Sequence, residues 1–295
     1  SEYTSNIVLT RKKNGKLRFC VNYKPLNRLV CRDHFPMPVI EDLIPRLYGM
    51  MFFSSLDLRD GFYHVKIKDS SRRFTSFITE DGQYEFLRLP FGYANSPAAF
   101  VRFIIKVLMD LIREGVLVVF IDDILVCTRT IVEHLSVLKR LFQILSDNHI
   151  QLQLSKCNFM ITRAEFVGYE ISHGEVTLSE RHIEAVESFP VPVDVRSVQR
   201  FIGLASYFRK FVRDFNKIAF PLYECMKVKL DFNFNAECLE AFESLKRKLV
   251  TRPVLCIYSP DADTQLHTDA SSVGFGGILM QRQDYDNDYH PVMFF

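Results

Sequence analysis

Residues 116–127 read Val116-Leu117-Val118-Val119-Phe120-Ile121-Asp122-Asp123-Ile124-Leu125-Val126-Cys127, an apolar run that two adjacent carboxylates interrupt. Two β-rich apolar segments on either side of a short polar pair are typical of a β-hairpin. Asp-Asp has none of the turn advantage of Asn-Gly or Asp-Gly. Because a buried carboxylate without a partner is costly, we expect Asp122 and Asp123 to be exposed at the turn or held by cations. Two like charges side by side favour a divalent metal ion.

Length and composition indicate a globular protein of two or three domains. The 295 residues are 48% apolar and 24% charged, which is an ordinary globular balance. No apolar stretch reaches about 18 residues, so we expect no membrane contact. The sequence begins without a signal peptide or an initiator Met, which predicts a segment of a longer polyprotein. Seven scattered cysteines without Cys-x-x-Cys spacing predict free thiols and no zinc site.

Charge is distributed unevenly along the chain. The net charge of +2 identifies no partner, but residues 1–32 hold eight Lys and Arg against one acid, a local charge of +7. Residues 196–217 hold six against one, a local charge of +5. Such patches suit a phosphate backbone, and solvated protein surfaces explain them about equally well.

Hydrophobic periodicity and turn residues predict a mixed α and β chain. Hairpins are expected within residues 7–21, with its turn at Asn14-Gly15, and within 74–91, with its turn at Asp81-Gly82. Further strands are expected at 52–58, 159–171 and 264–281, and in the last residues of the chain. The expected helices are 39–49, 98–113, 131–148, 195–211 and 236–249.

A third acid would strengthen the case for a metal site. Two metal ions that act on a phosphoryl group need oxygen ligands from several strands. Asp57, at the end of an expected strand, could join Asp122 and Asp123. Taken alone, Asp57 is more often a turn or cap residue, and its spacing from the pair does not show that the three meet.

Several motifs, in one order, resemble those of reverse transcriptases. The pattern is most similar to gypsy-type long-terminal-repeat retrotransposons, with retroviral enzymes more distant, and it covers essentially the whole chain. The motifs are Leu56-Asp57-Leu58, Leu89-Pro90-Phe91-Gly92, Asn95-Ser96-Pro97-Ala98-Ala99-Phe100, Phe120-Ile121-Asp122-Asp123, Phe166-Val167-Gly168-Tyr169, Phe201-Ile202-Gly203-Leu204-Ala205-Ser206-Tyr207-Phe208-Arg209 and Thr268-Asp269-Ala270-Ser271.

The resemblance implies an α+β polymerase built like a right hand. Residues 1–175 would form fingers (1–32 and 65–95) and palm (33–64 and 96–175), and 176–230 the thumb. A connection at 231–263 and the beginning of a ribonuclease H-like domain at 264–295 would follow. In that domain Asp269 matches the first metal-binding Asp, but its further acids would lie beyond Phe295, so we expect no ribonuclease H activity from this chain.

The resemblance also implies a two-metal polymerase centre. Asp57, Asp122 and Asp123 match the carboxylates that bind two Mg²⁺ ions, with Mn²⁺ as the alternative, and the carbonyl of Leu58 could add a ligand. Lys156 matches a lysine that could protonate the pyrophosphate.

The residues expected at the nucleotide come from three places in the chain. Lys12 and Arg18 match residues that grip the triphosphate, although a merely exposed charged hairpin is the alternative. Phe62 matches a ring that leaves no room for a 2′-hydroxyl, and a core Phe is the alternative. Asp60 and Gly61 beside it, and Phe91 where retroviral enzymes carry Gln, complete the expected set.

The residues expected at the template and primer follow the same motifs. Phe166, Val167, Gly168 and Tyr169 match the hairpin that positions the primer end. Gln199, Gly203 and Tyr207 match a thumb surface that follows the minor groove, although part of this amphipathic helix must face the core. Asn95, Ser96 and Pro97 complete the expected template–primer set.

The resemblance predicts an RNA-directed DNA polymerase. Its partners would be an RNA or DNA template with a primer, deoxynucleoside triphosphates and the rest of the pol polyprotein, in a cytoplasmic retroelement particle or in the nucleus. The alternatives are a catalytically silent nucleic-acid-binding remnant, another metal-dependent nucleotidyl or phosphoryl transferase, and a telomerase or group II-type polymerase.

Overall fold

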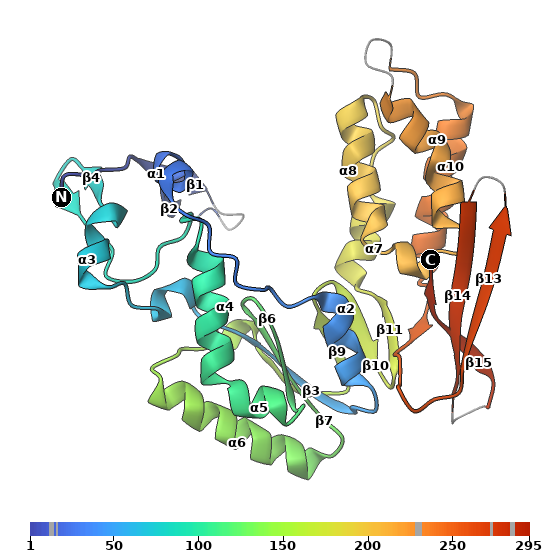
Figure 1. Cartoon of the computed structure of the whole chain (residues 1–295), viewed down its shortest axis with the longest axis horizontal. Helices are drawn as coiled ribbons and strands as arrows, with labels where there is room; N and C mark the ends of the chain where they lie inside the picture. The colour runs from blue at the N-terminus through green and yellow to red at the C-terminus, as the bar shows by residue number, and fades with distance from the viewer. Residues whose placement is uncertain (12–14, 16, 228–231, 272–273, 284–286) are drawn as a thin grey trace. The chain divides into compact units, whose positions relative to one another are not determined.

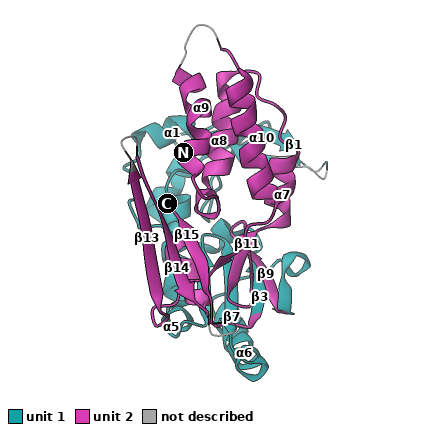
Figure 2. Cartoon of the chain, turned by 90° about the vertical axis from the view of Figure 1, so that its right-hand side faces the viewer, with its two compact units in different colours: residues 1–40, 53–160 teal, residues 41–52, 161–295 magenta. Residues whose placement is uncertain are grey.

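The computed structural model describes residues 1–11, 15, 17–227, 232–271, 274–283 and 287–295. These residues form two compact units, one of residues 1–40 and 53–160 and one of residues 41–52 and 161–295 (Figure 2). The expected turn residue Asn14 lies outside the described residues. In the described part of the chain no helix has the length and apolar character needed to cross a membrane.

The first unit contains a four-stranded sheet with the order β6-β7-β3-β8 (Figure 1). Its strands are β3 (Phe52–Asp57), β6 (Leu117–Phe120), β7 (Asp123–Thr128) and β8 (Asn158–Ile161). The helices α4 (Ser96–Val107), α5 (Met109–Arg113) and α6 (Ile131–Asp147) contribute the other side of its core. Strands β3 and β7, which carry the expected carboxylates at their ends, are therefore neighbours in one sheet.

Helix α6 has clear local causes. Thr130 caps its first turn by accepting a hydrogen bond from the amide of Glu133, and the capping oxygen replaces a missing helical partner. Its buried residues recur at helical spacing and face the sheet, so burial of this stripe stabilises the helix. They are His134, Val137, Leu138, Leu141 and Leu145.

A buried polar cluster ties α6 to the sheet. His134 is fully buried, its Nε2 lies 2.7 Å from Ser54 Oγ on β3 and its Nδ1 lies 2.8 Å from Thr128 Oγ1 on β7. The Thr128 hydroxyl donates to the carbonyl of Thr130, so it must accept from Nδ1–H, and Nε2 then accepts from Ser54. Ser54 Oγ also accepts from the amide of Met160 on β8. One neutral imidazole thus joins three neighbouring strands and a helix.

The rest of the first unit is built from short elements. Strands β1 (Ile7–Arg11) and β2 (Leu17–Val21) pair antiparallel, as do β4 (Phe77–Thr79) and β5 (Gly82–Tyr84). The second turn consists of Glu80 and Asp81 rather than the expected Asp81-Gly82, because Gly82 already pairs with Thr79. The remaining elements are α1 (Lys24–Leu29), α3 (Asp69–Arg72), η2 (Gly61–His64) and η3 (Arg73–Thr75).

The second unit combines two small sheets with helices. One sheet has the order β12-β11-β10-β9 and the other the order β13-β14-β15. The strands are β9 (Arg163–Phe166), β10 (Tyr169–Ser172), β11 (Glu175–Leu178), β12 (Leu255–Cys256), β13 (Thr264–Ser271), β14 (Gly274–Arg282) and β15 (Tyr289–Phe294). Its helical elements are α2 (Ile40–Leu43), η1 (Ile44–Leu47), α7 (Glu180–Glu187), α8 (Val195–Ser206), η5 (Arg209–Phe211), α9 (Phe215–Lys227) and α10 (Ala236–Val250). The 3₁₀ turn η4 (Leu154–Lys156) belongs to the first unit.

Three expected helices differ in the structure. The helix expected at 39–49 is only α2 followed by the 3₁₀ turn η1, because Pro45 lacks the amide that would continue it. The helix expected at 98–113 starts at Ser96 and breaks at Leu108 into α4 and α5. The helix expected at 195–211 ends at Ser206, and its start is fixed by a capping box between Asp194 and Ser197.

Candidate active site

The β6–β7 hairpin places the two carboxylates differently from each other. Phe120 pairs with Asp123, so the two-residue turn consists of Ile121 and Asp122, and Asp123 is the first residue of β7. The expectation that both aspartates form the turn is therefore wrong for Asp123. Ile121 has φ 53°, a left-handed conformation that costs a β-branched residue roughly 1–2 kcal/mol. Sequence reasoning missed this residue, although a two-residue hairpin loop requires positive φ.

Asp122 is the most constrained carboxylate of the pair. Its Oδ1 is buried and has no hydrogen-bond partner among the described residues. Burial raises the pKa of Asp122, the carboxylates of Asp123 and Asp57 raise it further, and Lys156 opposes them. A carboxylate oxygen that is buried without a donor fits a position that a cation occupies.

Gly61 explains how this carboxylate is accommodated. A Cβ atom at residue 61 would lie 3.3 Å from Asp122 Oδ1 and 3.2 Å from Cζ of Phe100. Both contacts are tighter than ordinary van der Waals packing, so a side chain here would press on the carboxylate. The structure thereby places two sequence-predicted residues, Gly61 and Asp122, beside each other.

Asp57 lies at the end of β3 and is held by Lys156. The Nζ atom of Lys156 is 3.0 Å from Asp57 Oδ2. The carbonyl of Asp57 accepts from the amide of Gln153, and the amide of Arg59 donates to the carbonyl of Gln151. Leu58 and Leu152 therefore face each other in an isolated antiparallel β-bridge, and the backbone hydrogen bonds of this bridge are made by the residues on either side of them. The carbonyl of Leu58 itself accepts no backbone hydrogen bond from the described residues. That carbonyl is available as the expected ligand.

The three carboxylates are of the chemical type that binds a divalent cation, but their oxygen atoms are not yet arranged around a common point. In the described residues no group of three or more His, Cys, Asp or Glu side chains is placed as a finished metal cage. Asp57 is turned towards Lys156, while Asp122 has an unpartnered oxygen and lies within the electrostatic reach of both other aspartates. A cation would have to draw Asp57 away from Lys156, and hard oxygen donors of this kind are those that Mg²⁺ and Mn²⁺ prefer.

A cluster of three phenylalanine rings lies beside Gly61, the residue that neighbours Asp122. The ring of Phe62 lies 4.8 Å from that of Phe91 and 5.5 Å from that of Phe100, measured between centroids. Phe62 is half-buried, and 43% of Phe91 is exposed. Asp60 precedes them in a left-handed conformation with φ 51°, which Asp tolerates. Phe62 is thus partly a core residue and partly a surface that a ligand can touch. Each of the two interpretations of the sequence, a ring at the nucleotide and a core residue, matches one part of this description.

Two of the expected triphosphate residues cannot be placed. Lys12 lies outside the described residues. The backbone of Arg18 pairs with Thr10 in the β1–β2 hairpin, but its side chain also lies outside the described part. Their contact with a triphosphate stays a prediction.

The Asn95-Ser96-Pro97 motif serves the structure of unit 1 at the start of α4. Asn95 Nδ2 donates to the carbonyl of Cys31 and its Oδ1 accepts from the amide of Asp33. Ser96 is fully buried, and its hydroxyl donates to the carbonyl of Pro90 over 2.7 Å. The expected contact of Ser96 with the template or primer is therefore wrong for its side chain, because no part of that side chain is accessible. Ser96 instead stabilises the loop before α4. Pro97 starts the helix, where its missing amide is harmless.

The remaining expected residues lie in the second unit. Phe166 and Tyr169 are buried at the ends of β9 and β10, so only the turn residues Val167 and Gly168 are available for a primer contact. The role of this hairpin at the primer end stays a prediction. Gln199, Gly203 and Tyr207 are exposed and recur every four residues along and just beyond α8, so they share one face. Asp269 is exposed on β13.

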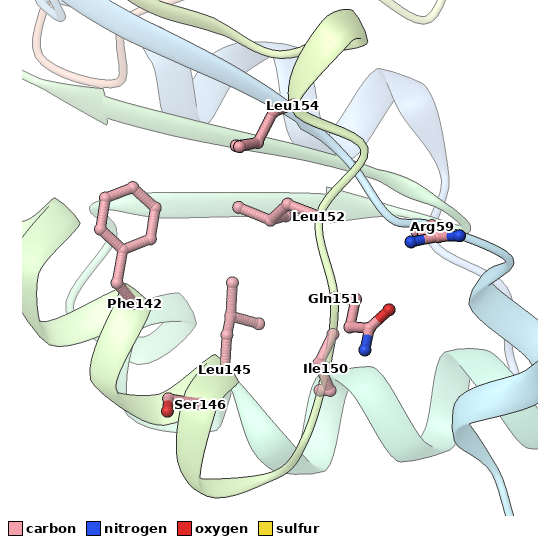
Figure 3. A pocket seen from close by; sticks show the side chains of 8 residues that line it. All are labelled: Arg59, Phe142, Leu145, Ser146, Ile150, Gln151, Leu152 and Leu154. Atoms are coloured by element: carbon pink, nitrogen blue, oxygen red, sulfur yellow. The ribbon is translucent and has the colours of Figure 1, made fainter.

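A pocket of about 510 Å³ lies between α6, the segment 150–154 and Arg59 (Figure 3). Its walls are mostly apolar, and Leu152, which lines it, bridges to Leu58. The lining residues are Arg59, Phe142, Leu145, Ser146, Ile150, Gln151, Leu152 and Leu154. Sequence reasoning did not identify this pocket.

Comparison with solved structures establishes the fold of the chain. A foamy viral protease–reverse transcriptase in complex with double-stranded DNA superimposes with a TM-score of 0.89 at 24% identity, over 99% of this chain and 51% of that chain. A foamy viral protease–reverse transcriptase in complex with an RNA/DNA hybrid gives a TM-score of 0.83 at 23% identity, over 99% and 39%. The fold is therefore that of a nucleic-acid polymerase, which confirms the predicted α+β right-hand class.

Sequence comparison defines the family more narrowly. Residues 10–171 match the family described as reverse transcriptase (RNA-dependent DNA polymerase), and residues 234–295 match the RNase H-like domain found in reverse transcriptase. The chain belongs to the reverse transcriptase family, as the motifs predicted. No comparison tests the expected domain boundaries at 175, 230 and 263 or the individual site residues, which stay predictions.

The curated relatives are polyproteins of transposons. The retrovirus-related Pol polyprotein from transposon 297 of Drosophila melanogaster is 32% identical over 95% of this chain. The transposon Tf2-3 polyprotein of Schizosaccharomyces pombe is 30% identical over 98% of this chain. The chain spans about a quarter of the length of these relatives, 26% and 22% respectively.

Proposed function

We propose that this chain is the RNA-directed DNA polymerase of a gypsy-type long-terminal-repeat retrotransposon, acting by template-directed addition of deoxynucleotides to a primer 3′ end. The observation that carries the proposal is the buried, unpartnered Oδ1 of Asp122 beside the carboxylates of Asp57 and Asp123. Such a centre is costly for a protein unless cations complete it. In a catalytically silent remnant, these carboxylates would destabilise the fold without serving a function.

Each residue of the centre has a defined task in this proposal. Asp57, Asp122 and Asp123 hold two Mg²⁺ ions, or Mn²⁺ in their place, with the Leu58 carbonyl as a further ligand. Bound there, the ions supply charge neutralisation and an activated primer hydroxyl. Lys156, whose ammonium lies at the Asp57 carboxylate, would donate a proton to the departing pyrophosphate. Gly61 leaves room beside Asp122, and the Phe62 ring excludes a 2′-hydroxyl.

The partners follow from the same proposal. They are an RNA or DNA template with its primer, deoxynucleoside triphosphates gripped by Lys12 and Arg18, and the remainder of the pol polyprotein. In this proposal Asp60 and Phe91 contact the nucleotide and Asn95 contacts the template–primer. The protein would act in a cytoplasmic retroelement particle, with the nucleus as the alternative.

Primer extension tests the function directly. With poly(rA)/oligo(dT), dTTP and Mg²⁺, the protein should incorporate nucleotide, and Asp122→Asn should reduce the rate by at least about a hundredfold, because the centre then lacks one charged ligand. Asp81→Asn, in the exposed β4–β5 turn, is the matched control and should act like the original protein. Equal incorporation by the Asp122→Asn protein would refute the assignment of the centre. Absence of incorporation by the unaltered protein would favour the silent remnant.

Sugar selection tests the nucleotide site separately. The ring of Phe62 is expected to favour dNTPs over rNTPs, and Phe62→Ala should relax this preference, since the small side chain leaves space for the 2′-hydroxyl. The measurement is the ratio of kcat/KM for dTTP and UTP. An unchanged ratio would count against the gate and leave the polymerase assignment intact.

A further inference from the structure

The turn between β9 and β10 has an unfavourable backbone conformation. Phe166 pairs with Tyr169, so Val167 and Gly168 alone form the loop. Both have positive φ, 48° and 84°, which matches the turn type that suits a twisted hairpin. Glycine adopts this conformation freely, but for the β-branched Val167 it is sterically unfavourable. Contacts from elsewhere in the unit must therefore hold the turn.

Hydrogen bonds from two different helices hold the carbonyl groups of this turn. The hydroxyl of Tyr207, which directly follows α8, donates to the carbonyl of Val167 over 2.8 Å. The amide of Ser179, which precedes α7, donates to the carbonyl of Gly168 over 3.0 Å. The turn is thus tied to both helices through its own peptide groups.

The ring of Tyr207 is fixed by its neighbours. It stacks on the ring of Tyr169, with centroids 5.6 Å apart, and on that of His182, 6.4 Å apart. His182 Nδ1 lies 2.9 Å from the hydroxyl of Ser179. The ring of His182 also lies close to Gly168, where a Cβ atom would be only 2.8 Å from its Cε1. The hydroxyl of Tyr207 therefore has little freedom to leave the turn.

We propose that the hydroxyl of Tyr207 is a positioning group that fixes the Val167–Gly168 turn and, through it, the primer 3′ end. The second half of this inference rests on the proposed function, which assigns the turn to the primer end. From the sequence Tyr207 was expected to touch the minor groove directly, and its exposed edge, with 39% of the residue accessible, can still do so. The hydroxyl has a different task, because it acts through Val167 rather than on the nucleic acid.

The matched variants are Tyr207→Phe and Tyr223→Phe. The first removes the hydrogen bond to Val167 and keeps the stacked ring. The second removes a hydroxyl from α9 in the same unit, where the described residues show no hydrogen bond between Tyr223 and the turn. Any effect of Tyr207→Phe that Tyr223→Phe lacks is therefore attributable to the hydroxyl of Tyr207, which donates to the carbonyl of Val167 and also interacts with the side chain of Tyr169.

Hydrogen–deuterium exchange tests the structural half without requiring activity. In Tyr207→Phe the amides of residues 163–172 should exchange about fivefold faster, which corresponds to the removal of one neutral hydrogen bond. In Tyr223→Phe they should exchange as in the unaltered protein. Equal exchange in both variants would overturn the inference, whatever the protein catalyses.

Single-turnover incorporation tests the functional half. From a preformed complex with poly(rA)/oligo(dT), Tyr207→Phe should incorporate dTTP about fivefold more slowly, while its Kd for the template–primer stays within about twofold. A weaker Kd with an unchanged rate would assign Tyr207 to duplex binding and overturn the positioning role. If the unaltered protein incorporates nothing, the proposed function fails, and the exchange experiment still decides whether the hydroxyl fixes the turn.

Discussion

At the scale of single residues, Asp122 shows the conflict between stability and function. A half-buried carboxylate with an orphaned oxygen and two acidic neighbours weakens the metal-free fold. The same features make it a strong cation ligand, because the cation removes the repulsion and supplies the missing partner. Function and stability therefore make opposite demands on this residue.

Asp122→Asn should stabilise the metal-free protein while it abolishes incorporation. The amide carries no charge, so we expect a gain of about 1 kcal/mol in the free energy of unfolding, or a Tm higher by about 2 °C. Thermal denaturation in EDTA measures this. Excess Mg²⁺ should reverse the order, because it stabilises only the protein that binds it. A lower Tm of Asp122→Asn in EDTA would show that Asp122 has a partner that stabilises it.

Lys156 competes with a metal ion for the same carboxylate. Its Nζ lies 3.0 Å from Asp57 Oδ2, and both side chains are partly exposed. Lys156→Gln should therefore bind Mg²⁺ more readily, lowering the Mg²⁺ concentration for half-maximal activity about twofold to threefold, which is typical of removing an exposed ion pair. Incorporation at saturating Mg²⁺ should fall at least about tenfold if Lys156 is the proton donor.

The measurement that checks this is a Mg²⁺ titration of the incorporation rate. Lys139→Gln, on the exposed face of α6, controls for the removal of one positive charge. A fall in rate together with a higher Mg²⁺ requirement would contradict the competition and show that Lys156 instead supports the metal site.

The candidate site was predictable from the sequence where residue type and motif decide it. The motifs predicted that Asp57 and Asp122 belong together, and in the structure the two carboxylates interact electrostatically while Gly61 lies beside Asp122. Burial was not predictable: Ser96 is inaccessible because its hydroxyl bonds inside the loop, which depends on the tertiary fold rather than on local sequence. Ile121 was missed for a similar reason, since β propensity places it in a strand and only the pairing of Phe120 with Asp123 forces it into the turn.

At the scale of elements, the His134 cluster predicts how the first unit responds to pH. Burial lowers the pKa of His134, and the Glu133 carboxylate opposes this weakly. The unfolded chain, with a His pKa near about 6.5, then binds a proton more tightly than the folded one. Stability is therefore complete above about pH 6.5 and decreases as the pH falls below that value.

His134→Gln should remove this pH dependence. Between about pH 6.5 and pH 5 the free energy of unfolding of the unaltered protein should fall by up to about 1.4 kcal/mol per pH unit for one proton, as linkage requires. The measurement is urea unfolding at a series of pH values, with His34→Gln, an exposed position, as the control. If His34→Gln and His134→Gln have the same pH profile, His134 is not the responsible group.

Elements with strong periodicity were predicted and elements that depend on tertiary contacts were not. The helix expected at 131–148 is α6, ending at Asp147. Helix α9 is not among the expected helices, and Pro221 lies inside it, where proline usually breaks a helix. The buried residues Phe215, Ala219 and Leu222 supply the packing that outweighs the missing hydrogen bond. The carbonyl of Pro221 also accepts from Cys238 on α10.

At the scale of the whole molecule, the structure refines the second of the two basic segments seen in the sequence, residues 196–217. Of the six cations in residues 196–217, Lys210 is directed inward, with its Nζ 4.4 Å from the centre of the Tyr169 ring, and burial lowers its pKa. Arg213 lies 3.8 Å from Asp214. Arg196 is exposed, three residues before Gln199 on the face of α8 that also carries Gly203. The local charge of +5 is thus not uniformly available to a phosphate backbone.

The salt dependence of template–primer binding should separate these cations. Removing one ion pair with a phosphate lowers the slope of log K against log salt by about 0.7–0.9, so Arg196→Gln should lower it by about this amount. Lys210→Met removes the same charge but keeps the apolar stem over Tyr169, and because this ammonium faces a ring rather than a phosphate, the slope should not change. The measurement is fluorescence anisotropy of a labelled RNA–DNA hybrid between about 50 and 200 mM salt. An equal change in both variants would mean that net charge alone governs binding, and the arrangement of cations on α8 would then carry no information about the path of the duplex.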